Sequence, residues 1–159
     1  MRITILAVGK IKERYLRDGI AEFVKRLGPF CRLEIQELDE ERMPDNPSAA
    51  QKEQALGREG ERLLKHIPAG SHVFVQDVIG KQQSSEELAE TFASLATSGD
   101  SHLTFVIGGA FGLSDDVRKA ADVRISFSKM TFTHQMIRLL LVEQIYRAFK
   151  IWRGEKYHW

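Results

Sequence analysis

The sequence contains one cysteine and few prolines and glycines, and each shortage excludes a class of protein. Cys31 has no second cysteine with which to form an intramolecular disulfide, and no Cys/His pair has zinc-finger spacing. Twelve glycines and four prolines in 159 residues are too few for a collagen-like or low-complexity chain. With 43% hydrophobic and 28% charged residues, the composition is typical of a globular protein, and we expect one domain over residues 1–159.

Long apolar runs are also missing. The longest, residues 3–8 and 139–142, are far shorter than the roughly 18 residues that a membrane-spanning helix needs. Residues 3–8 are followed by Gly9 and Lys10 without a small-residue cleavage pattern, so they indicate a strand and not a signal peptide. We therefore expect a cytoplasmic protein with no membrane partner.

The small net charge of +1 hides an uneven distribution. Residues 1–32 hold eight Lys/Arg against three Asp/Glu, residues 33–123 hold eight against seventeen, and residues 124–159 hold seven against two. Two basic ends on an acidic middle favour a polyanion-binding surface where the termini meet, although solvated helix faces explain the same pattern equally well.

Strand patterns alternate with helix patterns along the chain. Short apolar, β-branched or alternating runs predict strands at residues 3–8, 32–38, 72–78, 103–107 and 123–127, with 32–38 at a sheet edge. Apolar residues at helical spacing predict helices at 12–27, 48–66, from about 85, from 115 to about 121, and at 134–152. The first of two capping boxes is Ser48 with Gln51, and the second is Ser84 with Glu87. This alternation predicts an α/β fold with a mostly parallel sheet and helices on both faces.

In such folds ligands bind beyond the carboxyl ends of the strands, so the loops after the third, fourth and fifth strands are the default site. The glycine turn at residues 108–112 lets the backbone approach a ligand, but it lacks the dinucleotide fingerprint, and taken alone it favours a tight strand-to-helix turn. No phosphate-binding loop, serine-hydrolase elbow or cluster of metal-binding carboxylates is present, so we expect no metal.

Two further segments are candidates for chemistry. In the polar loop 126–135, His134 could act as a general base or as a hydrogen-bond donor to phosphate, or it could only make a hydrogen bond at a helix start. Arg138 follows one turn later on the same face. In the tail, Tyr157, His158 and Trp159 combine aromatic rings with hydrogen-bond donors, which suits stacking on an unpaired base, although terminal residues are often frayed.

Five ordered motifs together resemble one family. They are residues 3–10, the turn at 106–109, the loop 127–134, the helix segment 143–151 and the closing Tyr157-His158. The chain resembles the ribosomal RNA large subunit methyltransferase H family, within the SPOUT methyltransferases. The resemblance implies an S-adenosylmethionine-dependent homodimer with a C-terminal trefoil knot. It also implies methylation of the imide nitrogen N3 of a pseudouridine in helix 69 of 23S rRNA, within the assembled ribosome.

The resemblance also assigns roles to residues. His134 orients or deprotonates the base, Arg138 holds phosphate or imide oxygens, and Arg138, Tyr157 and His158 contact RNA, with the tail free to serve the partner subunit. The cofactor pocket falls on Gln76, Gly108, Phe127, Ser128, Lys129, Met130, Thr131 and Phe132. The chain departs from the family pattern at Gln76, Thr133 and Trp159, where the family has Leu, Pro and a basic residue.

Two other functions remain open from the residues alone. A nucleotide- or RNA-binding α/β module without catalysis explains the charge pattern and the glycine turn, but leaves the loop 127–132 unexplained. A flavodoxin-like enzyme is disfavoured because the first strand is followed by Gly9 alone, without a cluster of hydroxyl residues.

Overall fold

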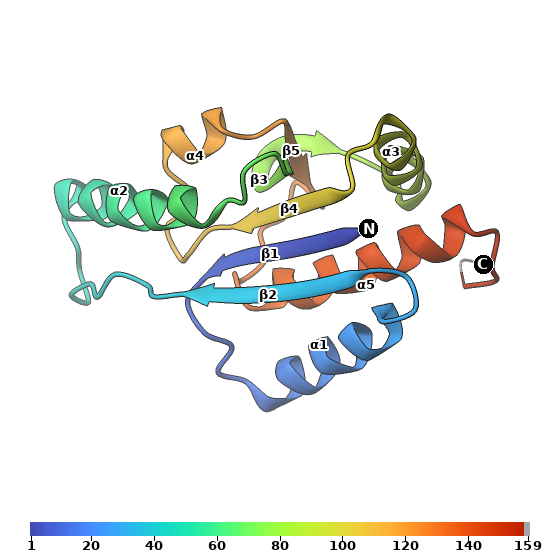
Figure 1. Ribbon diagram of the computed structural model, residues 1–159. Helices are drawn as coiled ribbons and strands as arrows, with labels where there is room; N and C mark the ends of the chain where they lie inside the picture. The colour runs from blue at the N-terminus through green and yellow to red at the C-terminus, as the bar shows by residue number, and fades with distance from the viewer. Residues whose placement is uncertain (158–159) are drawn as a thin grey trace.

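The computed structural model describes residues 1–157, and a five-stranded parallel sheet forms its centre (Figure 1). The strands are β1 (Arg2–Val8), β2 (Arg32–Leu38), β3 (His72–Gln82), β4 (His102–Ile107) and β5 (Val123–Ser126), in the order β2-β1-β4-β3-β5. The helices are α1 (Arg14–Leu27), α2 (Ala49–His66), α3 (Ser85–Ser98), α4 (Asp115–Lys119) and α5 (Met136–Trp152). The predicted α/β fold is confirmed, with β2 at the predicted edge.

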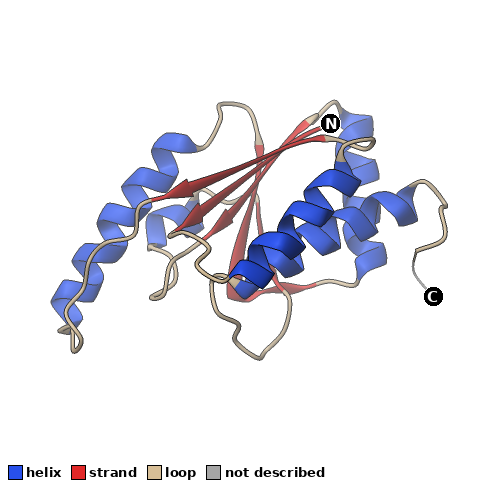
Figure 2. Cartoon of the chain, turned by 90° about the horizontal axis from the view of Figure 1, so that it is seen from below, coloured by secondary structure: helices blue, strands red, loops and turns tan. Residues whose placement is uncertain are grey.

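Helices cover both faces of the sheet (Figure 2). On one face α1, α3 and α5 pack on a core that includes Ile5, Phe74 and Phe105, and on the other α2 and α4 pack on one that includes Leu6 and Val106. Alternate residues of β1 enter opposite cores, which is why residues 3–8 form a continuous apolar run.

Local sequence signals fix most element ends. Both predicted capping boxes are present, with Ser48 opening α2 and Ser84 opening α3, and Ser114 caps α4 through the amide of Val117. The long last helix begins at Met136 and not at His134. Residues 134–135 form a turn that leads into the helix, and Thr133 holds this turn: its Oγ1 accepts from Met136 N and its carbonyl accepts from Ile137 N.

The third strand differs from its predicted end. Gln76 and Lys81 both pair with Ile125, so residues 77–80 form a bulge before the strand resumes. Gly80 is required there, because a Cβ at this position would lie 2.6 Å from the carbonyl carbon of Ile125. This bulge projects at the carboxyl end of the sheet.

Two glycines of α2 provide a test of how closely this helix packs. A Cβ on Gly60 would lie 2.2 Å from Ser114 Oγ, whereas one on Gly57 would have nothing within 4 Å. We expect Gly60→Ala to lower the free energy of unfolding by about 1–3 kcal/mol, because Ser114 must abandon its capping position. Gly57→Ala is the control and should raise it by about 0.5–1 kcal/mol. Urea denaturation of both variants checks this, and equal effects would contradict the close approach of α2 and α4.

Candidate functional site

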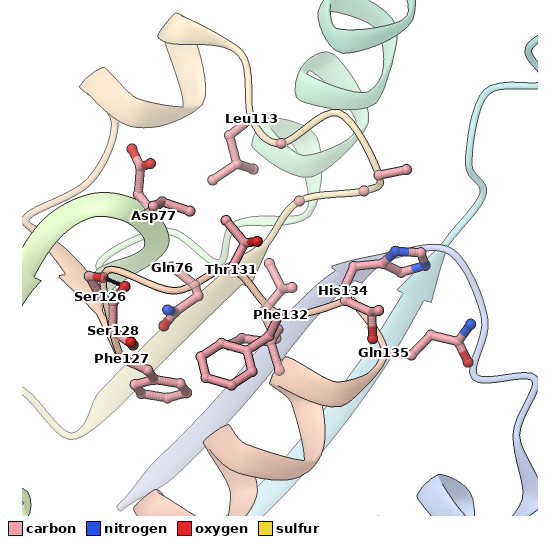
Figure 3. Close-up of a pocket in the computed structure, with 18 of the residues that line it drawn as sticks. Gln76, Asp77, Leu113, Ser126, Phe127, Ser128, Thr131, Phe132, His134 and Gln135 are labelled. Atoms are coloured by element: carbon pink, nitrogen blue, oxygen red, sulfur yellow. Dashed lines mark hydrogen bonds between the residues drawn. The ribbon is translucent and has the colours of Figure 1, made fainter.

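A cavity of about 910 Å³ lies at the carboxyl edge of the sheet, where the predicted site was placed (Figure 3). Its walls are the bulge of β3, the glycine turn after β4, the loop between β5 and α5, and the beginning of α1. Aliphatic and aromatic side chains alternate with a few polar groups along these walls, a composition typical of a site for a small organic molecule.

The glycine turn brings backbone atoms to the cavity. A Cβ on Gly108 would lie 2.3 Å from the carbonyl oxygen of Gly112, so no other residue fits without moving the turn. Gly112 has a φ of 89°, in the left-handed region, and its amide donates to the carbonyl of Gly109 at 3.1 Å. The turn is therefore a tight strand-to-helix connection, and its residues 108–112 line the cavity.

The bulge of β3 is held by a buried carboxylate that sequence reasoning missed. Asp77 is 9% exposed, and its Oδ2 accepts from Arg118 Nε at 2.9 Å and from Arg124 Nη2 at 2.8 Å. Burial by itself raises the pKa of Asp77, but the hydrogen bonds from the two arginines outweigh it and the pKa lies below its ordinary value. Within the neighbouring sequence only Gly80 indicated a bulge here, because the two arginines that bind Asp77 are more than 40 residues away.

Most residues that the resemblance assigned to the cofactor line this cavity. Within the loop between β5 and α5, Ser126 Oγ donates to the carbonyl of Ser128 at 2.9 Å, and Met130 N donates to Ser128 Oγ at 2.9 Å. Lys129 does not line the cavity and is exposed. The assigned residues that do line it are Gln76, Gly108, Phe127, Ser128, Met130, Thr131 and Phe132.

His134 also lines the cavity, on the side away from Ser126 and Phe127 (Figure 3). Its Nε2 lies 3.5 Å from the position that a Cβ on Gly9 would occupy, and Glu40 Oε2 lies 3.2 Å from the same position. Burial and the nearby charge of Arg138 lower the pKa of His134 below its ordinary value. The imidazole is therefore neutral near pH 7 and able to accept a proton.

Arg138 is placed differently from its predicted role as an RNA contact. It is 1% exposed and does not line the cavity. Its guanidinium donates to Glu37 Oε1 at 2.9 Å and to the carbonyls of Val8 and Gly9 at 2.7 and 2.8 Å. Because a buried cation needs such partners, the structure corrects the prediction: Arg138 holds the ends of β1 and β2 and cannot reach phosphate in this conformation.

Tyr157, the described residue of the tail, lies apart from the cavity of its own chain. Tyr157 stacks edge-on against Tyr146 with ring centroids 4.9 Å apart, and its hydroxyl donates to Glu143 Oε1 at 3.2 Å. These partners lie in the middle of α5, whereas the cavity is at its amino end. His158 and Trp159 lie outside the described residues.

A second buried carboxylate supports the glycine turn from behind. Glu59 of α2 is 7% exposed, its Oε1 accepts from Glu41 N at 2.8 Å, and its Oε2 lies 3.1 Å from the Cβ position of Gly109. Burial, followed by the charge of Glu40, raises the pKa of Glu59 to about 7. The burial of Glu59 could have been predicted from the sequence, because its helical spacing puts it on the inward-facing stripe of Leu56 and Leu63.

Neither a metal centre nor a membrane span is found in the described part of the chain. No group of three or more His, Cys, Asp or Glu among residues 1–157 could hold a metal ion. Within the same residues, no helix combines the length and the apolar character that a membrane crossing requires.

The chain and its fold match one class of enzyme. Residues 1–158 match the family model described as "Predicted SPOUT methyltransferase". Among solved structures, a probable methyltransferase from Bordetella pertussis matches with a TM-score of 0.55 and 16% identity over 93% of this chain and 95% of that one. A probable methylase family protein from Haemophilus influenzae matches with a TM-score of 0.53 and 13% identity, over 99% and 70%. At these identities the structural likeness shows the fold alone.

Curated relatives narrow the class. Proteins named "Ribosomal RNA large subunit methyltransferase H" from Halothermothrix orenii and Carboxydothermus hydrogenoformans are 56% and 54% identical to this chain, over 99% of each partner in both comparisons. A protein of the same name from Clostridioides difficile is 54% identical over the same share. The chain belongs to the ribosomal RNA large subunit methyltransferase H family of SPOUT methyltransferases.

The raised pKa of Glu59 has a measurable consequence for stability. A carboxyl with a pKa near 4.5 when unfolded and about 7 when folded binds its proton more tightly in the folded state. Its contribution is therefore fully present below pH 4.5 and is lost as the pH rises to about 7. We expect Glu59→Gln to remove this loss, so that its stability relative to the parent rises by about 3 kcal/mol between pH 4.5 and 8. Denaturation at several pH values checks this, with exposed Glu61→Gln as the control, and parallel pH profiles for parent and Glu59→Gln would contradict it.

Proposed function

We propose that this protein transfers a methyl group from S-adenosylmethionine to the imide nitrogen N3 of a pseudouridine in helix 69 of 23S rRNA, within the assembled ribosome and hence in the cytoplasm. The observation that carries the proposal is the single cavity in which Gln76, Gly108, the loop 127–132 and His134 meet. The support from relatives is that closely similar chains of the same length are named ribosomal RNA large subunit methyltransferases.

The residues of the cavity fit the cofactor. The tight glycine turn presents its backbone along the cavity wall, and Phe127 and Phe132 supply aromatic faces for an adenine ring. Gln76 Oε1 is buried and has no hydrogen-bond partner among the described residues, so it can accept from an amino group. When bound, S-adenosylmethionine supplies a methyl group on a positively charged sulfur, which needs alignment more than activation.

His134 is the proposed group that orients or deprotonates the target base. As the new bond forms between N3 and the methyl carbon and the sulfur–carbon bond breaks, the N3 proton must leave. A neutral imidazole at the cavity wall can accept it directly or pass it to water. Arg138 acts as a positioning residue through Val8 and Gly9, whose carbonyls it holds directly beside His134.

We further propose a homodimer in which the tail completes the partner's site. Tyr157 cannot serve the cavity of its own chain from the middle of α5. Trp152 is 40% exposed at the end of the same helix, next to this tail, which is typical of a surface that a second copy covers.

The proposal includes one domain and a C-terminal trefoil knot. β5 lies at one edge of the sheet, whereas α5 packs between α1 and α3, so residues 127–135 must cross the carboxyl ends of the neighbouring strands (Figure 1). This crossing supports the threaded connection that the family resemblance implies.

The function is tested on ribosomes from a strain that lacks this gene. We expect the purified protein with S-adenosylmethionine to add one methyl group to N3 of the helix 69 pseudouridine on assembled ribosomes, with little activity on protein-free rRNA. Mass mapping of rRNA fragments locates the methyl group. Equal methylation of naked rRNA, or methylation elsewhere, would overturn the substrate assignment. Binding of cofactor and RNA without any methyl transfer would favour the non-catalytic module.

A single-residue variant provides the control for this test. His134→Ala should reduce kcat about 100-fold or more while the affinity for S-adenosylmethionine in calorimetry changes little, because the imidazole acts on the base and not on the cofactor. Unchanged kcat would remove His134 from the catalytic group.

A truncation tests the tail. We expect deletion of residues 157–159 to abolish methylation while cofactor affinity stays nearly constant and stability changes by no more than about 1 kcal/mol. Tyr157→Phe is the matched control, since it keeps the ring stacked on Tyr146 and removes only the hydroxyl. Single-turnover methylation and calorimetry on the same preparations check the result. Retained activity in the truncated protein would mean that the tail is only a chain end.

A further inference from the structure

The segment between β1 and the first turn of α1 carries a cluster of cations beside the cavity. We call it the basic arm and define it by Lys10, Lys12, Arg14 and Arg17, all of them exposed. It belongs to the strongly basic first part of the chain, and neither the cavity nor the proposed chemistry uses its charges.

The charges of the basic arm are weakly engaged within the chain. Lys10 has no ion-pair partner among residues 1–157. Lys12 and Glu40 lie 3.8 Å apart with 71% and 44% of their side chains exposed, and Arg14 and Asp18 lie 3.5 Å apart with 88% and 70% exposed. Such surface pairs contribute between zero and about 1 kcal/mol, so a phosphate group can replace either acidic partner at little cost.

The backbone of the arm is nevertheless fixed to the site. Ile11 is 9% exposed, and its amide donates to Glu37 Oε1 at 3.0 Å. The amide of Lys12 donates to Gln135 Oε1 at 2.8 Å, and Gln135 lines the cavity next to His134 (Figure 3). Lys10 and Lys12, on either side of the buried Ile11, are both exposed. The cations are thus held in register with the cavity by two residues from distant parts of the chain.

An exposed aromatic ring completes the surface. Tyr15 is 63% exposed, and together with Glu13 and Leu16 it lines the cavity mouth where the arm enters α1. Cations that track a phosphate backbone, combined with an aromatic face on which a base can stack, are the features by which proteins bind single-stranded or looped nucleic acid.

We propose that the basic arm binds the phosphate backbone of the rRNA loop that contains the target nucleotide, with Tyr15 stacking on an unpaired base next to it. This proposal rests on the proposed function and adds the surface on which the RNA docks. The arm directs the target base over the cavity because its backbone is fixed to Gln135, one residue from His134.

The test compares two triple variants with equal loss of charge. The first, called the arm variant, is Lys10→Ala/Lys12→Ala/Arg14→Ala, which removes three of the four cations of the arm. The control is Arg2→Ala/Lys25→Ala/Arg32→Ala, three exposed cations from the same third of the sequence that lie at the opposite, amino end of the sheet. For each protein we measure direct binding to large ribosomal subunits at several salt concentrations, methylation of the same subunits, cofactor affinity by calorimetry, and thermal unfolding.

The arm variant should bind subunits about tenfold or more weakly near 0.1 M salt, and its plot of log affinity against log salt should be shallower by about 2, as expected for the loss of three phosphate contacts. Its cofactor affinity and melting temperature should match the parent's, and the control triple should bind like the parent. Tyr15→Ala should weaken binding without changing the salt slope.

Three results would overturn the proposal. If the arm variant binds subunits as tightly as the parent, the arm is not part of the RNA-binding surface. If both triple variants weaken subunit binding equally, general basicity and not the arm drives docking. Weakened subunit binding with an unchanged salt slope and unchanged binding to the isolated rRNA would point to a ribosomal protein as the partner. Because binding is measured apart from methylation, a parent protein that binds but transfers no methyl group would refute the proposed reaction while the arm result still stands.

Discussion

The site depends on one buried cation. An arginine side chain stays protonated in proteins, so the burial of Arg138 costs several kcal/mol unless acceptors surround it. It is 1% exposed and donates to the carboxylate of Glu37 and to the carbonyls of Val8 and Gly9. These four residues come from the ends of two strands and the first turn of the last helix. Satisfying one charge therefore fixes the junction from which the basic arm and the loop before α5 both depart.

That junction couples two parts of the protein that would otherwise be independent. Glu37 Oε1 accepts from Ile11 N as well as from Arg138, so the acceptor that neutralises the cation also holds the basic arm. On the other side, α5 begins just before Arg138, which places His134 and Gln135 at the cavity wall. A shift of the guanidinium would move the arm and His134 together, so the geometry between the arm and the cavity is set by packing inside the molecule.

How far the sequence predicts this arrangement depends on the range of each interaction. Strands and helices follow from periods of two and 3.6 residues and from caps within four residues, so their existence and the edge position of β2 could be predicted. The glycine turn could also be predicted, because such a tight turn requires residues without side chains and the sequence shows its glycines directly. The burial of Arg138 could not be predicted, because its acceptors lie about 100 and 130 residues away in the sequence and an arginine on a helix face is usually solvated. The bulge of β3 arises from pairing with Ile125, a register that no local pattern encodes.

In the proposed function, a protein with a net charge of only +1 selects one RNA loop. Behind the glycine turn lies Glu59, whose burial raises its pKa to about 7. The cations of the basic arm face solvent, and Glu40 lies 3.8 Å from one of them, Lys12. Nonspecific affinity for RNA scales with the number of phosphates neutralised, and here that number is small. In the proposed function, the fit and stacking of the target base in the cavity must therefore add to the few charge contacts that the basic arm supplies.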